Sequence, residues 1–194
     1  MIISPDRFNW LHAAEPPTAT SLADVVLLND EGEVQRDLSA AGVRAAAAGL
    51  AEGMRAQGWI GERVVLAIVD ELDFLATMLA CMHAGVIAVP AVSPGTVRNN
   101  DRLTHFVADS DAVAILVDVE AQRQLRLRPE AVPFAAAIVE IEAINSKPVE
   151  NDPVTIAVDS PAYLQYTSGS TKAPKGVIIT HRNLATQLQM LQRS

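Results

Sequence analysis

Residues 63–90 read RVVLAIVDELDFLATMLACMHAGVIAVP, and this stretch decides the fold class. Residues 63–69 are an almost continuous apolar run, which is typical of a strand buried on both faces. Residues 71–84 carry two apolar stripes at helical spacing, which predict a helix that is buried nearly all round and ends at Gly85. Residues 86–90 predict a short second strand. Strand, helix and strand in this order favour a parallel pair joined by a right-handed crossover.

The same alternation continues on both sides of this unit. Before it, residues 39–57 predict a helix with Ser39 as its N-cap and Gly58 as its stop. After it come a loop at 91–96, a helix at 100–108, a strand at 112–117, a helix at 119–127 and an apolar run at 135–141. This alternation predicts an α/β fold, a mostly parallel sheet with flanking helices. Residues 145–152 are expected to form a surface connection within one domain.

Composition limits the class of protein. The chain has 194 residues, of which 49% are hydrophobic, and its formal net charge is −8. No apolar run approaches the roughly 18 residues that a spanning helix needs, and no secretory signal is visible, so we expect a globular cytoplasmic protein without a membrane span. Because 23 acidic residues outnumber 15 basic ones, we expect no nucleic-acid partner. Cys81 is the one cysteine, which excludes an internal disulfide and a multi-cysteine zinc site.

A loop rich in glycine and hydroxyl residues follows near the end of the sequence. It reads TSGSTKAPKG over residues 167–176, between strand-like runs at 162–166 and 177–180. Such a loop suits phosphate, because small residues let backbone N–H groups approach the oxygens, hydroxyls add hydrogen bonds, and Lys172 and Lys175 supply charge. It is not a Walker loop, since the sequence has no Gly-Lys-Ser/Thr triplet. The loop is a candidate polyphosphate cradle, with a plain surface turn as the alternative.

The residues of this loop resemble a known signature. YTSGSTKAPKG at residues 166–176 is similar to Y-T-S-G-[ST]-T-G-x-P-K-G, the signature loop of the adenylate-forming enzymes, which include acyl-CoA synthetases and the adenylation domains of peptide synthetases. LQYTSGS from Leu164 and the stretch 72–91 are similar to the fatty-acyl-AMP ligase branch. The resemblance runs from about Leu38 to Leu191. It implies that residues 1–194 are the incomplete first part of the large N-terminal domain of such an enzyme.

The resemblance implies a two-step reaction that uses ATP and Mg²⁺. A fatty carboxylate attacks the α-phosphate of ATP, pyrophosphate leaves, and the acyl-adenylate passes to the thiol of an acyl carrier protein. Lys175 would offset the charge that develops on the pyrophosphate, and Thr167 would assist at Mg²⁺. The residues implied to contact the β- and γ-phosphates are Ser168, Gly169, Ser170, Thr171 and Gly176.

The sequence departs from the family pattern in two places and in length. Lys172 stands where the family has glycine, and it would either reshape the loop or add a phosphate contact. Residues 90–94 read PAVSP, where the ligase branch often has an aromatic residue and two prolines. The family's ribose-binding acidic residue, magnesium-binding glutamate, most of its acyl tunnel and its C-terminal domain with the catalytic lysine all follow the loop. We therefore expect these 194 residues alone not to adenylate at a useful rate.

Three interpretations stay open. The chain is part of a fatty-acyl-AMP ligase, one half of a split ligase completed by a partner chain, or a non-catalytic binding or scaffold module. Outside the loop, Cys81, His83 and His105 are expected to be structural. His181 either caps the last helix or lines the nucleotide site. Tyr166 is expected to pack beside the loop and to help fix the direction in which the loop leaves the sheet.

Overall fold

The computed structural model describes residues 7–8, 25–28, 31–127, 136–144, 155–167 and 174–191, and its centre is a six-stranded sheet. The strand order is β10-β9-β5-β4-β6-β7. Neighbouring strands from β9 to β7 run parallel, and β10 pairs antiparallel with β9 at one edge. The predicted mostly parallel α/β sheet is therefore confirmed. The strands are β4 (Arg63–Leu66), β5 (Ile87–Pro90), β6 (Ala114–Val117), β7 (Ala137–Glu140), β9 (Pro161–Thr167) and β10 (Lys175–Thr180).

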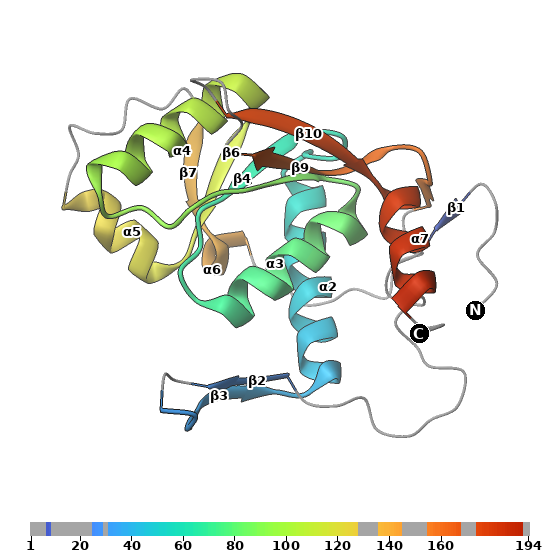
Figure 1. The fold of residues 1–194 in the computed structure, drawn as a ribbon, viewed down its shortest axis with the longest axis horizontal. Coiled ribbons are helices and arrows are strands. Elements are labelled where there is room, and N and C mark those ends of the chain that lie inside the picture. Colours follow the sequence, from blue (N-terminus) through green and yellow to red (C-terminus); the bar gives the residue numbers. More distant parts are fainter. Residues whose placement is uncertain are drawn as a thin grey trace.

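Helices cover both faces of this sheet (Figure 1). Along β4, Val64 and Leu66 pack with α2, α3 and α6, whereas Val65 packs with α4 and α5, because successive side chains of a strand alternate between faces. Within the described ranges, no helix has the length and apolar character that a bilayer crossing requires. The helices are α2 (Ala40–Ala56), α3 (Glu71–Ala84), α4 (Val97–Ser110), α5 (Val119–Arg126), α6 (Ile141–Ile144) and α7 (His181–Leu191).

Local sequence signals set the ends of the two long helices on one face. Ser39 caps α2, as predicted, by accepting the backbone N–H of Gly42 at 3.0 Å. Asp70 caps α3 by accepting two backbone N–H groups of its first turn, at 3.0 and 2.9 Å. Gly85 ends α3 with a φ of 74°, which glycine adopts without steric cost. Every residue of α3 except Glu71 is buried or half-buried, which confirms the expectation of a helix buried nearly all round.

Several elements differ from those expected from the sequence. The predicted helix at 100–108 is longer, because Thr96 caps α4 before the expected start. The apolar run at 135–141 divides into β7 and α6. Residues 145–152 lie outside the described residues. Two small antiparallel sheets were not predicted: β1 (Arg7–Phe8) pairs with β8 (Ile156–Ala157), and β2 (Val25–Leu28) pairs with β3 (Val34–Leu38).

The parallel strands bring their carboxyl ends to one edge of the sheet. The connection after β4 leads to β5 on one side, and the connection after β6 leads to β7 on the other, so the strand order reverses between β4 and β6. Open α/β sheets bind ligands outside the carboxyl ends of their strands. β9 ends at Thr167 on this edge, and the candidate loop begins there.

Candidate phosphate-binding site

The two stems of the candidate loop are neighbouring strands. β9 and β10 pair so that Thr167 lies opposite Lys175, and Tyr166 lies opposite Gly176. Thr167 and Lys175 are both exposed and therefore accessible to a ligand. The structure brings these four residues together at the base of the loop. The other predicted phosphate-contacting residues, Ser168, Gly169, Ser170 and Thr171, lie outside the described residues, as does Lys172.

Gly176 allows the second stem to approach a tyrosine ring closely. A Cβ at position 176 would lie 3.2 Å from Cζ of Tyr166 and 3.4 Å from its hydroxyl oxygen. Protein interiors are densely packed, so a larger residue here would displace the ring or the stem. This packing accounts for a glycine at position 176 independently of any phosphate contact.

Tyr166 anchors the first stem to α4. Its ring stacks on Phe106, with the ring centroids 4.1 Å apart and the planes 20° from parallel. Its hydroxyl donates a hydrogen bond to Oδ2 of Asp109 at 2.7 Å. Burial, followed by the interaction with Asp109, raises the pKa of the Tyr166 phenol well above its usual value. The phenol therefore remains a protonated donor at neutral pH, and the expectation that Tyr166 packs beside the loop is confirmed.

The second stem also contacts α4. Nε2 of His105 lies 3.2 Å from the carbonyl oxygen of Pro174, and the tautomer that is protonated on Nε2 donates a hydrogen bond to it. The His105 ring also meets Tyr166 edge-on, with centroids 6.2 Å apart. Sequence reasoning gave His105 and Asp109 no part in the site. The signal available was their four-residue spacing, which places both on one helix face.

His181 lies at the opposite end of β10 from the loop. It follows Thr180 directly, and its backbone N–H donates to the carbonyl oxygen of Ser160 at 3.2 Å. The six residues of β10 separate it from the loop by roughly 20 Å. His181 is 1% exposed, and burial lowers the pKa of its imidazole to about 4, which leaves the ring neutral at pH 7. This placement favours the packing role of His181 over a role in the nucleotide site.

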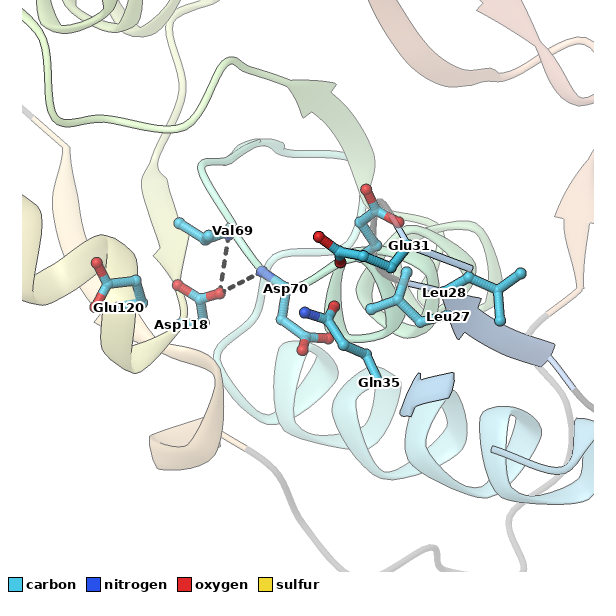
Figure 2. A pocket seen from close by; sticks show the side chains of 9 residues that line it. Leu27, Leu28, Glu31, Gln35, Val69, Asp70, Asp118 and Glu120 are labelled. Carbon is cyan, nitrogen blue, oxygen red and sulfur yellow. Dashed lines mark hydrogen bonds between the residues drawn. The ribbon is translucent and has the colours of Figure 1, made fainter. Parts of the chain in front are cut away.

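A pocket that sequence reasoning missed lies where the strand order reverses between β4 and β6. Its volume is about 680 Å³. Asp118, which directly follows β6, accepts the backbone N–H groups of Val69 and Asp70 at 2.8 Å each (Figure 2). The carboxylates in its wall would repel a polyphosphate, so the charge of the pocket favours the β9–β10 loop as the phosphate site. The pocket is lined by Leu27, Leu28, Glu31, Gln35, Val69, Asp70, Glu71, Asp118 and Glu120.

A Mg²⁺ ion would need oxygen ligands near the phosphate loop. No group of three or more His, Cys, Asp or Glu side chains in the described part of the chain is arranged to hold a metal ion. Mg²⁺ prefers oxygen ligands and commonly keeps several waters while it binds phosphate oxygens of the substrate. The exposed hydroxyl of Thr167 fits that pattern as a single ligand. Its role at Mg²⁺ stays a prediction.

The fold and the loop together define a class. The family model described as AMP-binding enzyme matches residues 10–194, and the chain belongs to this family. It is 36% identical over 149 residues to a putative fatty-acid–CoA ligase of Mycobacterium leprae, a match that covers 73% of this chain and 25% of that protein. It is 34% identical over 137 residues to a medium-chain-fatty-acid–[acyl-carrier-protein] ligase of Moorena producens, covering 63% of this chain and 22% of that protein.

A solved structure of a similar ligase also resembles this chain in fold and sequence. The fatty acyl-adenylate ligase of L. pneumophila, in complex with acyl adenylate and pyrophosphate, superposes with a TM-score of 0.71 at 30% identity, over 84% of this chain and 28% of that one. The resemblance to adenylate-forming fatty-acyl ligases is therefore confirmed. The chain spans about a quarter of the length of these relatives and corresponds to their N-terminal part.

Proposed function

We propose that this chain is the N-terminal portion of a fatty-acyl-AMP ligase and supplies its phosphate-binding loop. The observation that carries the proposal is the pairing of Thr167 with Lys175, which joins the hydroxyl and the charge of the motif at the carboxyl edge of a parallel sheet. The fatty-acid ligases among the relatives support the substrate class, and the L. pneumophila complex supports acyl-adenylate formation. Residues 1–194 are then one incomplete part of a single large domain.

The loop acts on the leaving group of the reaction. Backbone N–H groups and hydroxyls of residues 168–171 bind the β- and γ-phosphates of ATP, together with the N–H of Gly176. Lys175 offsets the negative charge that develops on the pyrophosphate, so its interaction is stronger in the transition state than with bound ATP. Mg²⁺, when bound, would neutralise phosphate charge, and the Thr167 hydroxyl is one oxygen that this chain would offer to it.

An acyl carrier protein is the acceptor that we infer for the acyl group. The Moorena producens relative is named as a ligase for an acyl carrier protein, whereas the Mycobacterium leprae relative is named as a ligase for CoA. Mass spectrometry of a holo-carrier protein, incubated with the complete ligase, ATP and a fatty acid, tests the choice. Acylation of the carrier thiol supports the inference, and formation of acyl-CoA alone in a parallel reaction contradicts it.

Exposed apolar side chains on β10 and α7 favour a chain that packs against further protein. Val177 and Ile178 of the edge strand β10 are 46% and 59% exposed, and Met190 and Leu191 of α7 are 67% and 66% exposed. Neighbouring exposed apolar side chains commonly mark an interaction surface. The observation favours the rest of a ligase, in the same polypeptide or in a partner chain of a split enzyme, over a free-standing scaffold module.

Calorimetric titration of the purified chain with inorganic pyrophosphate and with Mg-ATP tests the phosphate loop. We expect Lys175→Ala to weaken both affinities by about tenfold or more, because a charge-assisted hydrogen bond is lost. Arg44→Ala removes the same charge from α2, on the opposite face of the sheet from α4, and should leave both affinities unchanged. Equal affinities for all three proteins, or no binding by the unaltered chain, would contradict the proposal.

The isolated chain should bind phosphate without completing the reaction. Positioning and charge stabilisation in acyl-adenylate formation come from several chain segments acting together, and a quarter of a ligase supplies only some of them. We therefore expect no fatty-acid-dependent exchange of pyrophosphate into ATP by the purified chain. Exchange above the blank with any acid of a chain-length series would overturn this expectation.

A further inference from the structure

We propose that one face of α4 positions the phosphate-binding loop by holding both of its stems. Asp109 acts through Tyr166 on the stem that enters the loop, and His105 acts through the Pro174 carbonyl on the stem that leaves it. These are positioning residues, because neither is required to touch the ligand. The inference rests on the proposed function, since the spacing of the stems matters only if the loop binds a polyphosphate.

The first contact fixes the end of β9. The Tyr166 hydroxyl donates to Oδ2 of Asp109 at 2.7 Å, while its ring stacks on Phe106 at 4.1 Å and borders Gly176 of the other stem. Tyr166 lies one residue before Thr167, from which the loop begins. A displacement of this ring would therefore move both stems. The hydrogen bond joins residues 57 positions apart in the sequence, so it is a tertiary constraint on the loop.

The second contact fixes the start of β10. Nε2 of His105 meets the carbonyl oxygen of Pro174, the residue before Lys175. His105 and Asp109 are four residues apart and share a helix face, so a single rigid element sets the positions of both stems. Figure 1 shows this half of α4 beside the beginning of β10. Tyr166 before the loop and Pro174 after it are thus both held by α4.

Because Asp109 is negatively charged, electrostatic repulsion and a positioning role predict opposite effects of its removal on pyrophosphate binding. A carboxylate near a phosphate site repels the ligand, so electrostatics alone predicts that removing Asp109 tightens pyrophosphate binding. Positioning predicts the opposite, because loss of the acceptor releases Tyr166 and lets the stems move. Asp101 provides a matched control, since it is an exposed carboxylate on the same helix, two turns before Asp109.

The experiment measures inorganic pyrophosphate binding to the purified chain by calorimetry for five variants. We expect Asp109→Ala and Tyr166→Phe each to weaken binding by about tenfold, the factor that corresponds to a modest charged hydrogen bond. The double variant should be no weaker than either single one, because both remove the same hydrogen bond. Asp109→Asn keeps an acceptor oxygen and should restore most of the affinity. Asp101→Ala should bind as tightly as the unaltered chain, or slightly more tightly.

A second measurement reports on the stems without ligand. Amide ¹H–¹⁵N spectra of the free protein should show shifted signals for Lys175 and Gly176 in Asp109→Ala, and nearly unchanged signals in Asp109→Asn and Asp101→Ala. A purely structural role of Asp109 would lower thermal stability without this selective shift or the affinity loss. Because Asp109→Asn and Tyr166→Phe retain the packing of the ring on Phe106, the test does not depend on a variant that fails to fold.

The outcomes separate this proposal from the proposed function. If Lys175→Ala abolishes binding while Asp109→Ala binds as tightly as Asp101→Ala, the positioning role is wrong and the phosphate loop stands. If Asp109→Ala and Tyr166→Phe weaken binding additively, they do not act through one hydrogen bond and the positioning role is also wrong. If the unaltered chain binds no pyrophosphate, the phosphate loop and its positioning both fail.

Discussion

At the scale of single residues, Asp118 joins two strand ends at the point where the strand order reverses. Asp118 is 4% exposed. Oδ1 accepts the backbone N–H of Ala121 at 2.7 Å and caps α5, while Oδ2 accepts the backbone N–H groups of Val69 and Asp70. Carboxylate bonds to backbone N–H groups are among the stronger hydrogen bonds in proteins. Asp118 therefore holds the turn after β4 against the start of α5.

Replacement of Asp118 tests this role. Asp118→Ala should lower the free energy of unfolding by about 2–3 kcal/mol, because it removes a helix cap and leaves part-buried N–H groups without an acceptor. Urea denaturation measures the change. Glu120→Ala, at an exposed carboxylate of the same helix that pairs with Arg123, should change the midpoint little. Equal losses in the two variants would show that Asp118 has no special role.

The buried side chain of His181 predicts that the stability of the protein depends on pH. Burial lowers its folded-state pKa to about 4 from the usual 6.5, so between these values the unfolded chain binds more protons than the folded chain. The contribution of neutral His181 to stability is therefore fully present above about pH 6.5 and is lost as the pH drops towards about 4, by up to about 3 kcal/mol. Urea midpoints across this range measure it. In His181→Asn the part of the pH slope due to this side chain should disappear, and an unchanged slope would contradict the assignment.

At the scale of elements, Gly42 and Gly53 of α2 have different neighbours. A Cβ at Gly53 would overlap the carbonyl oxygen of Ile144, so the glycine allows the backbone of α6 to pack directly against α2. A Cβ at Gly42 would instead meet Cδ1 of Leu38 at 2.8 Å, the mobile end of a half-buried side chain. Backbone cannot yield as a side chain can, so the contact between α2 and α6 depends on Gly53.

Substitution of Gly42 and of Gly53 by alanine separates the effect of packing from that of helix propensity. Alanine favours a helix by about 1 kcal/mol over glycine, so Gly42→Ala should be neutral or slightly stabilising. Gly53→Ala should lower the free energy of unfolding by about 2 kcal/mol despite that gain, because α6 must move away. Thermal denaturation of the two variants compares them. Equal stability would mean that α6 does not pack on α2 in solution.

At the scale of the whole molecule, the two apolar clusters share the strands of one sheet. Val64 and Leu66 of β4 lie in the cluster with α2 and α3, and Val65 lies in the cluster with α4 and α5. Neither cluster can lose its strands without disrupting the other. This arrangement supports the proposal that residues 1–194 are part of one domain.

Calorimetry tests whether the chain unfolds as a single unit. The purified chain should unfold in one transition whose calorimetric and van't Hoff enthalpies agree, because the shared sheet couples both faces. Two resolved transitions would contradict a single folding unit. Tyr166→Phe is a useful comparison, since loss of its bond to Asp109 should lower the transition temperature without splitting the transition.

The sequence by itself determined the βαβ unit at residues 63–90, the bounds and the all-round burial of α3, and the identity of the loop between β9 and β10. Strong periodicity and the stop at Gly85 carry that information locally. It did not predict the small β2–β3 hairpin or the division of residues 135–141 into β7 and α6. Those segments are short, and their state depends on what they pack against.

Only the tertiary structure decided what surrounds the loop. Asp109 and Tyr166 are 57 positions apart, His105 and Pro174 are 69 apart, and Asp118 is 49 from Val69. Helical or strand periodicity reports which face of an element is apolar, and it carries no information on which distant polar group that face will meet. The motif at residues 166–176 thus follows from local sequence, whereas its attachment to α4 follows from crossovers that bring α4 beside β9 and β10.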